Sequence, residues 1–300
     1  KLLLAKDYRV FGSSRDAQIS SFGSLKKLSI YDQIEYVSMA HNDFRSVLQA
    51  LVKLEPDEVY NLAGQSSVGL SFQQPVETLE SIATGTLNLL EAIRFIAKPI
   101  RFYNAGSSEC FGNTGEHGAA NEETPFRPRS PYAVAKAAAH WEVANYREAY
   151  GLYACSGILF NHESELRPAR FVTKKIVESA VRISKGSKEK LELGNIQVWR
   201  DWGYAPEYVE GMQLMLQHDE PEDFVLATGT SHSLEEFISG IFAILGMDWK
   251  EHVSIKESFF RPSDIKYSRG NPEKAREKLN WQAHTQFPEL LERLIAAEID

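Results

Sequence analysis

The stretch Ser130-Pro131-Tyr132-Ala133-Val134-Ala135-Lys136 decides how the rest of this chain is interpreted. Tyr132 and Lys136 stand four residues apart, so a helix would place both side chains on one face. Pro131 suits the first position of that helix, and Ser130 suits its N-cap. A lysine ammonium beside a tyrosine hydroxyl favours the phenolate, whose pKa is ordinarily about 10. The pair is therefore a candidate acid/base at neutral pH, although the same spacing also suits a solvent-facing helical pair without chemistry.

A short strand and a polar turn are predicted upstream of this helix. Arg101–Ala105 is expected to be the strand, and it runs into Gly106-Ser107-Ser108-Glu109, where a strand end would present polar side chains. This order resembles the extended, nucleotide-sugar branch of the short-chain dehydrogenase/reductase superfamily. In that resemblance Ser107, Tyr132 and Lys136 form the Ser/Thr-Tyr-Lys catalytic group. Glu109 is the more specific feature, because a carboxylate two residues after the serine is what the 4,6-dehydratases carry.

Length and composition limit the class of protein. Three hundred residues can bury a sizeable core, as one large domain or two joined ones. The net charge of -8 argues against a nucleic-acid-binding surface. No apolar run approaches the ~20 residues of a membrane span. Cys110 and Cys155 have no other metal-ligating residues at a suitable spacing, and two such cysteines are typical of a protein from a reducing compartment. The sequence therefore predicts a cytoplasmic globular protein without a metal and without nucleic-acid or membrane partners.

Strands and helices alternate through the first half of the chain. Beyond the segments above, the pattern predicts strands at Glu35–Met39, Asp57–Ala63 and Tyr153–Phe160, and helices at Asp43–Leu54 and Pro75–Phe95. Such alternation is typical of an α/β fold with a doubly wound, Rossmann-type parallel sheet. We expect residues 1–160 to form an NADP-binding Rossmann domain. Residues 161–300 would form a smaller substrate-binding domain, with some segments returning to the first.

The first residues fit the interior of a dinucleotide-binding unit better than its beginning. Lys1–Lys6 resembles the last turns of a helix, and Tyr8–Gly12 is predicted to be the strand that follows. A Rossmann unit places its first strand and a glycine-rich turn before such a helix, and this sequence contains no such turn. We therefore expect either that the native polypeptide carries roughly 20 more residues upstream, or that the dinucleotide site is degenerate.

Polar and basic residues follow this strand, where a dinucleotide fold places the adenosine ribose. Arg15 suits the 2′-phosphate of NADP, with Ser14 as a further phosphate donor. The alternative is a solvated loop arginine, and the neighbouring Asp16 weakens the case for phosphate. NADP is the predicted cofactor.

The strand predicted at Asp57–Ala63 leads into Gly64-Gln65-Ser66-Ser67. Small residues at Ala63 and Gly64 would let the backbone approach a ligand closely. In the dehydratases that the chain resembles, a strand ending in Asn-Leu-Ala-Gly-Gln-Ser lies against the pyrophosphate and nicotinamide side of the cofactor. The resemblance implies cofactor contacts from Leu62, Ala63 and Gln65.

The second half carries the more specific resemblance. Asn161-His162-Glu163-Ser164 follows a strand, at the edge where α/β sheets bind ligands, and it leads into the cation-rich segment Arg167–Lys175. In the GDP-mannose 4,6-dehydratase family, Asn-His-Glu-Ser precedes a closely similar Phe-Val-Thr-(Arg/Lys)-Lys segment that holds the sugar nucleotide. Further matches are Leu193-Gly194-Asn195, Arg200-Asp201-Trp202-Gly203 and Arg261-Pro262-Ser263-Asp264. The chain departs from the family at Glu165, which is usually Pro, and at Tyr204, which is more often His or Trp.

The resemblance to this family implies a homodimer or homotetramer that converts GDP-mannose to GDP-4-keto-6-deoxy-mannose with NADP. In that implied reaction Tyr132 takes the proton of the 4-hydroxyl, Ser107 hydrogen-bonds the 4-oxygen, and Glu109 takes the C5 proton. The cofactor would also contact Tyr132, Lys136 and His162. The implied substrate contacts are Ser67, Asn161, Val172, Lys175, Gly194, Asn195, Arg200, Arg261 and Asp264.

Two alternatives stay open at this point. A nucleotide-sugar epimerase or reductase of the same superfamily would share Tyr132 and Lys136 but would not need Glu109. A non-catalytic nucleotide-sugar-binding protein would keep the fold without a glycine-rich turn.

Overall fold

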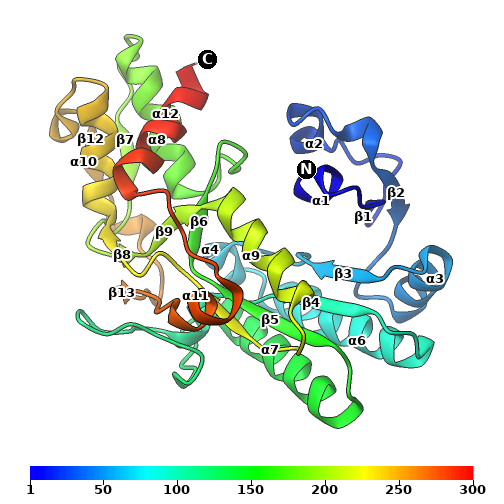
Figure 1. The fold of residues 1–300 in the computed structure, drawn as a ribbon. Coiled ribbons are helices and arrows are strands. Elements are labelled where there is room, and N and C mark those ends of the chain that lie inside the picture. The colour runs from blue at the N-terminus through cyan, green and yellow to red at the C-terminus, as the bar shows by residue number, and fades with distance from the viewer. Residues whose placement is uncertain (300) are drawn as a thin grey trace.

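A four-stranded parallel sheet forms the centre of the molecule in the computed structural model, which describes residues 1–299 (Figure 1). Its strand order is β10-β5-β4-β3, with β3 at Glu58–Asn61, β4 at Arg101–Ala105, β5 at Ala154–Leu159 and β10 at Phe224–Leu226. All three strand pairs are parallel, so the carboxyl ends of the strands meet at one edge of the sheet. Ligands of open α/β sheets bind at that edge.

Helices cover both faces of this sheet, as the alternation of elements in the sequence predicts. The helices α6 (Gly85–Ile96) and α7 (Pro131–Tyr150) pack below the strands in Figure 1, and α3 (Phe44–Leu54) packs against α6. The helix α9 (Ala205–Gln217) lies above β4 and β5, and α11 (Glu273–Leu279) packs against β10. The prediction of a doubly wound α/β fold is therefore confirmed.

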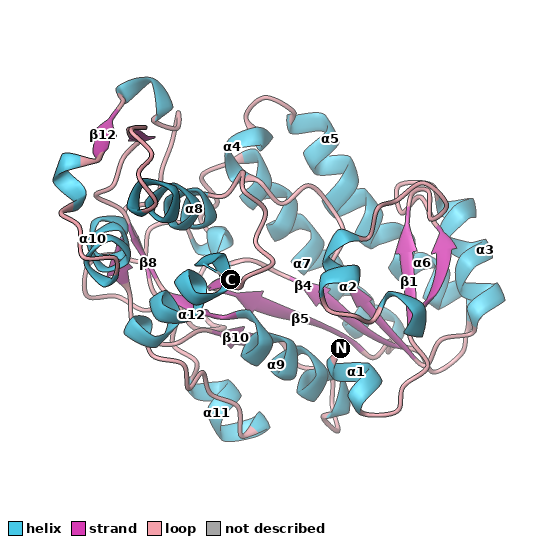
Figure 2. Cartoon of the chain, turned by 90° about the horizontal axis from the view of Figure 1, so that it is seen from above, coloured by secondary structure: helices cyan, strands magenta, loops and turns pink. Residues whose placement is uncertain are grey.

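The first two strands form a separate parallel pair. The strand β1 (Phe11–Ser14) pairs with β2 (Glu35–Ser38), and neither is hydrogen-bonded to β3. Figure 2 shows this pair standing apart from β4 and β5. The prediction of a strand at Tyr8–Gly12 is wrong at both ends: Asp7 adopts a left-handed conformation (φ 60°), and the Tyr8 hydroxyl donates to Glu58 Oε1 (3.2 Å), so the chain is a connector until residue 11.

The helix predicted at Pro75–Phe95 is interrupted by a wider turn. It consists of α5 (Pro75–Leu79), a π-helical turn at Glu80–Thr84, and α6. His41 lies against the start of α6, where a Cβ on Gly85 would come within 2.3 Å of the imidazole, so only glycine fits there. The His41 ring also contacts the carbonyl of Ser81 in the π-turn (2.7 Å). Gly85 thus permits a close packing contact between the start of α6 and His41.

The second half of the chain builds a core of its own. The helices α8 (Val172–Ser184), α10 (Leu234–Ile244) and α12 (Phe287–Ile299) surround it, and their inner faces are apolar. The short strands here are β6 (Asn161–Glu163), β7 (Leu191–Leu193), β8 (Trp199–Arg200), β9 (Trp202–Tyr204), β11 (His232–Ser233), β12 (Val253–Ile255) and β13 (Tyr267–Ser268). The remaining helices are α1 (Leu2–Ala5), α2 (Gly23–Lys27) and α4 (Val68–Ser71). Within residues 1–299, no helix is both long enough and apolar enough to cross a membrane.

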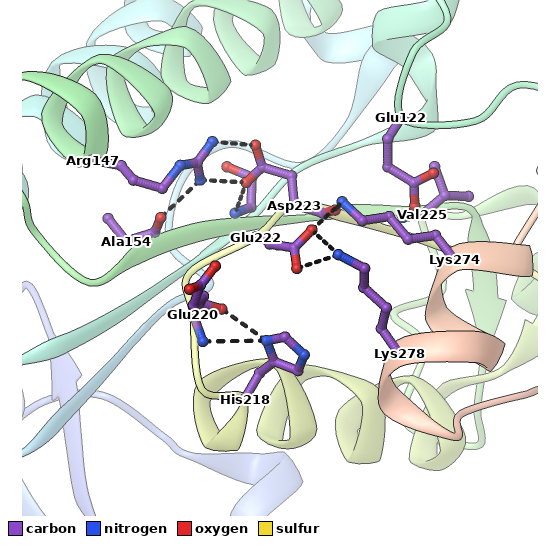
Figure 3. Close-up of polar contacts among 11 residues, drawn as sticks. Glu122, Arg147, Ala154, His218, Glu220, Glu222, Asp223, Val225, Lys274 and Lys278 are labelled. Carbon is purple, nitrogen blue, oxygen red and sulfur yellow. Dashed lines mark hydrogen bonds and ion pairs between the residues drawn. The ribbon is translucent and has the colours of Figure 1, made fainter.

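An ionic cluster fixes the amino ends of β5 and β10 (Figure 3). Arg147, in the last turn of α7, donates through both terminal nitrogens to Asp223 (3.0 and 2.8 Å). The same carboxylate accepts from the backbone amide of Ser156 (2.6 Å), and Lys274 of α11 donates to the Asp223 carbonyl (2.8 Å). The cluster therefore holds two helices and two strands in register at the end of the sheet opposite the ligand-binding edge.

Asp201 ties the turn between β8 and β9 to two loops. Its carboxylate is completely buried and accepts four hydrogen bonds. The donors are Thr228 N (2.8 Å), Thr228 Oγ1 (2.7 Å), Gly229 N (3.0 Å) and Gly270 N (3.3 Å). Burial raises the pKa of Asp201 to about 6, and these hydrogen bonds act in the opposite direction.

This network predicts a stability defect. Asp201→Ala leaves the part-buried donors of Thr228 and Gly229 and the buried amide of Gly270 unpaired, so the free energy of unfolding should fall by about 3 kcal/mol. Asp201→Asn is the matched control, since its carbonyl oxygen keeps part of the network and should lose less. Urea unfolding followed by circular dichroism measures both variants. An unchanged midpoint for Asp201→Ala would show that the network contributes nothing.

Candidate active site

A cavity of about 1710 Å³ runs along the carboxyl edge of the main sheet and into the second half of the molecule. At one end it reaches the gap between β1 and β3, where Phe11, Val37 and Val59 line it. Most of the residues predicted for the site line this one cavity. They are Leu62, Ala63, Ser67, Ser107, Glu109, Tyr132, Lys136, Asn161, His162, Val172, Lys175, Gly194, Asn195, Arg200, Arg261 and Asp264.

Three residues predicted to bind the cofactor do not line the cavity. Ser14 Oγ lies 2.6 Å from Ser20 Oγ within its own loop, and Arg15 is exposed directly after β1. Gln65 turns back, and its side-chain amide donates to Ser67 O (2.8 Å) and to Thr78 Oγ1 (3.2 Å). In this structure Gln65 therefore shapes its loop, while the neighbouring Ala63 faces the cavity.

The helix α7 begins as its sequence predicts. Ser130 is the N-cap, its Oγ accepting from Ala133 N (3.1 Å), and Pro131 is the first helical residue. Tyr132 and Lys136 consequently face the same cavity one turn apart. Lys136 is only 7% exposed. Its ammonium lies 6.0 Å from the centre of the Tyr132 ring and donates to Ala105 O at the end of β4 (2.7 Å).

Ser107 and Glu109 reach the cavity from the end of β4. Ser107 caps a single 3-10 turn, Ser108–Phe111, by accepting from Glu109 N (3.3 Å). This turn follows the strand directly, so the serine hydroxyl and the carboxylate both line the cavity that Tyr132 faces. The structure thus brings together the four residues that the sequence predicts to be catalytic.

Burial is the largest cause of the pKa shifts of Lys136, Tyr132 and Glu109. Burial lowers the pKa of Lys136 to about 8. It raises the pKa of Tyr132, and a hydrogen bond with the Ser107 side chain partly opposes that rise. Burial also raises the pKa of Glu109, and the positive charges of Arg200 and Arg261 oppose that rise. In this structure burial raises the pKa of Tyr132, because the phenol is desolvated and the Lys136 ammonium donates to Ala105 O.

Arg167 is a site residue that the sequence analysis did not single out. It belongs to the cation-rich segment and lines the cavity, and its guanidinium lies close enough to lower the pKa of Tyr132. Glu163 is only 3% exposed and holds Arg167 in place, because Arg167 Nε donates to Glu163 Oε2 (2.7 Å). The same oxygen accepts a hydrogen bond from Thr173 Oγ1 (2.9 Å). Burial, together with the Arg167 charge, lowers the pKa of His162 to about 4. The signal in the sequence was the spacing of Glu163 and Arg167, an acid followed four residues later by an arginine.

A second group of cations lines the cavity beyond Glu109. Arg200 is 7% exposed and donates to Ile265 O (2.7 Å) and to Asp264 Oδ1 (3.1 Å). Arg261 lies 3.6 Å from the same carboxylate oxygen. Two guanidinium groups held in this way suit a bound anion with several oxygens, such as a diphosphate.

The two departures from the family pattern contact each other. The Tyr204 hydroxyl donates to Glu165 Oε1 (2.8 Å), and the Arg293 guanidinium lies 4.9 Å from the Tyr204 ring centre. Glu165 does not line the main cavity, whereas Arg200 and Arg261 do. A polar contact between residues 165 and 204 thus takes the place of the usual proline.

A Rossmann-type sheet with a Ser-Tyr-Lys group and an added glutamate at its carboxyl edge defines a nucleotide-sugar enzyme of the short-chain dehydrogenase/reductase class. The family model described as GDP-mannose 4,6 dehydratase matches residues 1–294. GDP-mannose 4,6 dehydratase 1 from Arabidopsis thaliana is 45% identical over 312 residues, covering 100% of this chain and 85% of the relative. The Homo sapiens GDP-mannose 4,6 dehydratase is 39% identical, covering 100% and 87%. The chain belongs to the GDP-mannose 4,6-dehydratase family.

Solved structures share the fold. A UDP-glucose 4-epimerase from Thermus thermophilus, in complex with NAD, superposes with a TM-score of 0.85 at 25% identity, covering 99% of this chain and 93% of that one. A dTDP-glucose 4,6-dehydratase from Streptomyces venezuelae, with NAD bound, gives a TM-score of 0.87 at 19% identity, covering 98% and 90%. The overall fold is therefore common to epimerases and dehydratases, and the side chains of the site must distinguish them.

Proposed function

We propose that this protein converts GDP-mannose to GDP-4-keto-6-deoxy-mannose by oxidation at C4, loss of water across C5 and C6, and reduction at C6. The observation that carries this proposal is the placement of Glu109 in the same cavity as Ser107, Tyr132 and Lys136. An epimerase or reductase uses the last three residues but does not need the carboxylate. Membership of the GDP-mannose 4,6-dehydratase family supports the choice of substrate.

The course of the cavity supports a bound nicotinamide dinucleotide. It continues from Gly12 and Ser13 at the end of β1, past Leu62 and Ala63, to Tyr132. We propose that Arg15, which is exposed two residues after the cavity-lining Ser13, holds the 2′-phosphate of NADP from outside the cavity lining, and that Lys136 and His162 contact the cofactor at the other end. Bound NADP would accept the hydride from C4 and return it to C6.

The residues of the chain handle the protons. Tyr132 takes the proton of the 4-hydroxyl, and Ser107 hydrogen-bonds the 4-oxygen. A ketone at C4 acidifies the hydrogen on C5. Glu109 removes it as a proton and passes that proton to the departing 6-hydroxyl, which leaves as water. The proton that Tyr132 took from the 4-hydroxyl would return to C5 when the hydride reaches C6. The raised pKa of Glu109 suits this role, because a carboxylate with a higher proton affinity is a stronger base. Arg200 and Arg261 would bind the diphosphate and keep the sugar against these groups.

We further propose that residues 1–160 bind the cofactor and residues 161–300 most of the substrate, in a cytoplasmic homodimer or homotetramer. Val134 and Trp141 support self-association: they lie seven residues apart on one face of α7, and both side chains are exposed.

Replacement of Glu109 separates a dehydratase from an epimerase. Glu109→Gln keeps the shape but removes the base, so dehydration should fall roughly 10²- to 10⁴-fold. Exchange of the C5 hydrogen with deuterated solvent should fall with it, while GDP-mannose still binds. In the wild type, activity should decline on the acid side with a midpoint above 4.5, the ordinary value for glutamate, because the raised pKa of Glu109 must be exceeded for it to act as a base. Wild-type turnover by Glu109→Gln would make Glu109 a structural carboxylate.

Replacement of Arg15 tests the cofactor. A guanidinium pairs with a 2′-phosphate, which NAD lacks, so Arg15→Ala should weaken NADP binding about tenfold or more and leave NAD binding nearly unchanged. Titration of cofactor binding by protein fluorescence measures both affinities. The matched control is Arg45→Ala, which removes an exposed arginine that does not line the cavity. Equal losses for both cofactors, or tighter wild-type binding of NAD, would contradict the assignment to NADP.

A further inference from the structure

A contact between two exposed side chains joins the two halves of the molecule at the cavity. Arg170 precedes α8 in the second half, Ser66 follows β3 in the first half, and both line the cavity. The Arg170 guanidinium donates through Nη2 to Ser66 Oγ (3.3 Å). Residues 165–170 lie between two motifs that match the family, at 161–164 and 171–175. The match therefore assigns no role to Arg170.

The segment before α8, residues 164–171, is attached to the second half of the molecule, and we call it the strap. The Tyr204 hydroxyl donates to Glu165 Oε1 (2.8 Å). Arg167 Nε donates to Glu163 Oε2 (2.7 Å), and Glu163 is buried. Because these contacts all lie within the second half, the position of the strap does not depend on its contact with the first half.

An aromatic ring offers the Arg170 side chain a second partner on the strap itself. The guanidinium carbon of Arg170 lies 5.2 Å from the centre of the Phe171 ring, and that of Arg167 lies 4.7 Å from the same centre. A cation is attracted to an aromatic face at such distances. The ring therefore retains the Arg170 side chain near the cavity when its hydrogen bond to Ser66 is broken.

The contact between Arg170 and Ser66 is weak enough to open. Both side chains are exposed, and 3.3 Å is long for a hydrogen bond from nitrogen to oxygen. The sugar nucleotide has to enter the cavity, whereas the proposed reaction requires that the sugar stay there until the hydride returns. A contact that breaks and re-forms at the border of the cavity meets both requirements.

We propose that Arg170 is a latch that closes the cavity over the bound sugar by pairing with Ser66, so that the oxidised intermediate stays until the hydride returns. This inference rests on the proposed function for its substrate. Oxidation transfers a hydride from C4 to NADP+ and the hydroxyl proton to Tyr132, which leaves a 4-ketone and NADPH. If the ketone leaves at this stage, NADPH stays behind and the turnover is not completed. Arg170 is thus a positioning residue and not a catalytic one.

The test measures how often the intermediate escapes from protein loaded with NADP. Arg170→Ala should raise the NADPH formed per 4-keto-6-deoxy product roughly 2- to 13-fold over the wild type, which corresponds to the net contribution of one hydrogen bond. NADPH absorbance and chromatography of the sugar nucleotides measure the two quantities. A variant that only destabilised the fold would lower the rate without changing this ratio. Arg182→Ala is the matched control, because Arg182 is exposed on α8 and does not line the cavity, and it should behave as the wild type.

A double-mutant cycle shows whether the two side chains act through their contact. Ser66→Ala should give the same rise as Arg170→Ala, and the double variant should give no more than either change alone. Arg170→Lys keeps the charge and a donor, so its ratio should lie closer to that of the wild type. An unchanged ratio in Arg170→Ala, or independent effects that multiply in the double variant, would overturn the proposal. Failure of the proposed function would be seen separately, as a wild-type protein that forms no 4-keto-6-deoxy sugar from GDP-mannose.

Discussion

A buried chain of polar side chains across the main sheet is the constraint on which the site depends. Asn61 of β3 donates through its amide nitrogen to Asn104 Oδ1 on β4 (3.1 Å) and to Thr86 Oγ1 on α6 (3.0 Å). Asn104 in turn lies 3.5 Å from Ser156 Oγ on β5. These residues are direct partners in the strand register. Buried amides need partners, and a shift of one residue would turn them to the other face, so the register of the three strands is tightly specified.

The register of these strands determines where the predicted catalytic residues lie. The residues after Asn61 line one part of the cavity, and those after Asn104 lead to Ser107 and Glu109. The carbonyl of Ala105, directly after Asn104, is also the acceptor that holds Lys136. Because these groups belong to different strands and to α7, their common orientation follows from the sheet. The same burial that fixes them raises the pKa values of Tyr132 and Glu109, so packing and reactivity have one cause.

Local signals were sufficient for much of this arrangement. The Ser130 cap, the start of α7 at Pro131 and the strand Arg101–Ala105 follow from side-chain chemistry within a few residues, and each agrees with the structure. The features that the sequence could not provide depend on distant partners. The π-turn before α6 involves contacts with His41, and the late start of β1 depends on a contact between Tyr8 and Glu58. The protonation of Tyr132 depends on burial, and the link between Glu165 and Tyr204 joins segments that the sequence does not relate.

The central claim is that oxidation and reduction occur on one sugar, with water lost between them. Incubation of the protein with GDP-mannose deuterated at C4, followed by mass spectrometry and NMR of the product, tests it most directly. The account predicts that the label moves to C6 of a 4-keto-6-deoxy sugar within the same molecule, with no net change in cofactor. Recovery of the label at C4 in a sugar that keeps its 6-hydroxyl would indicate epimerisation and would contradict the account.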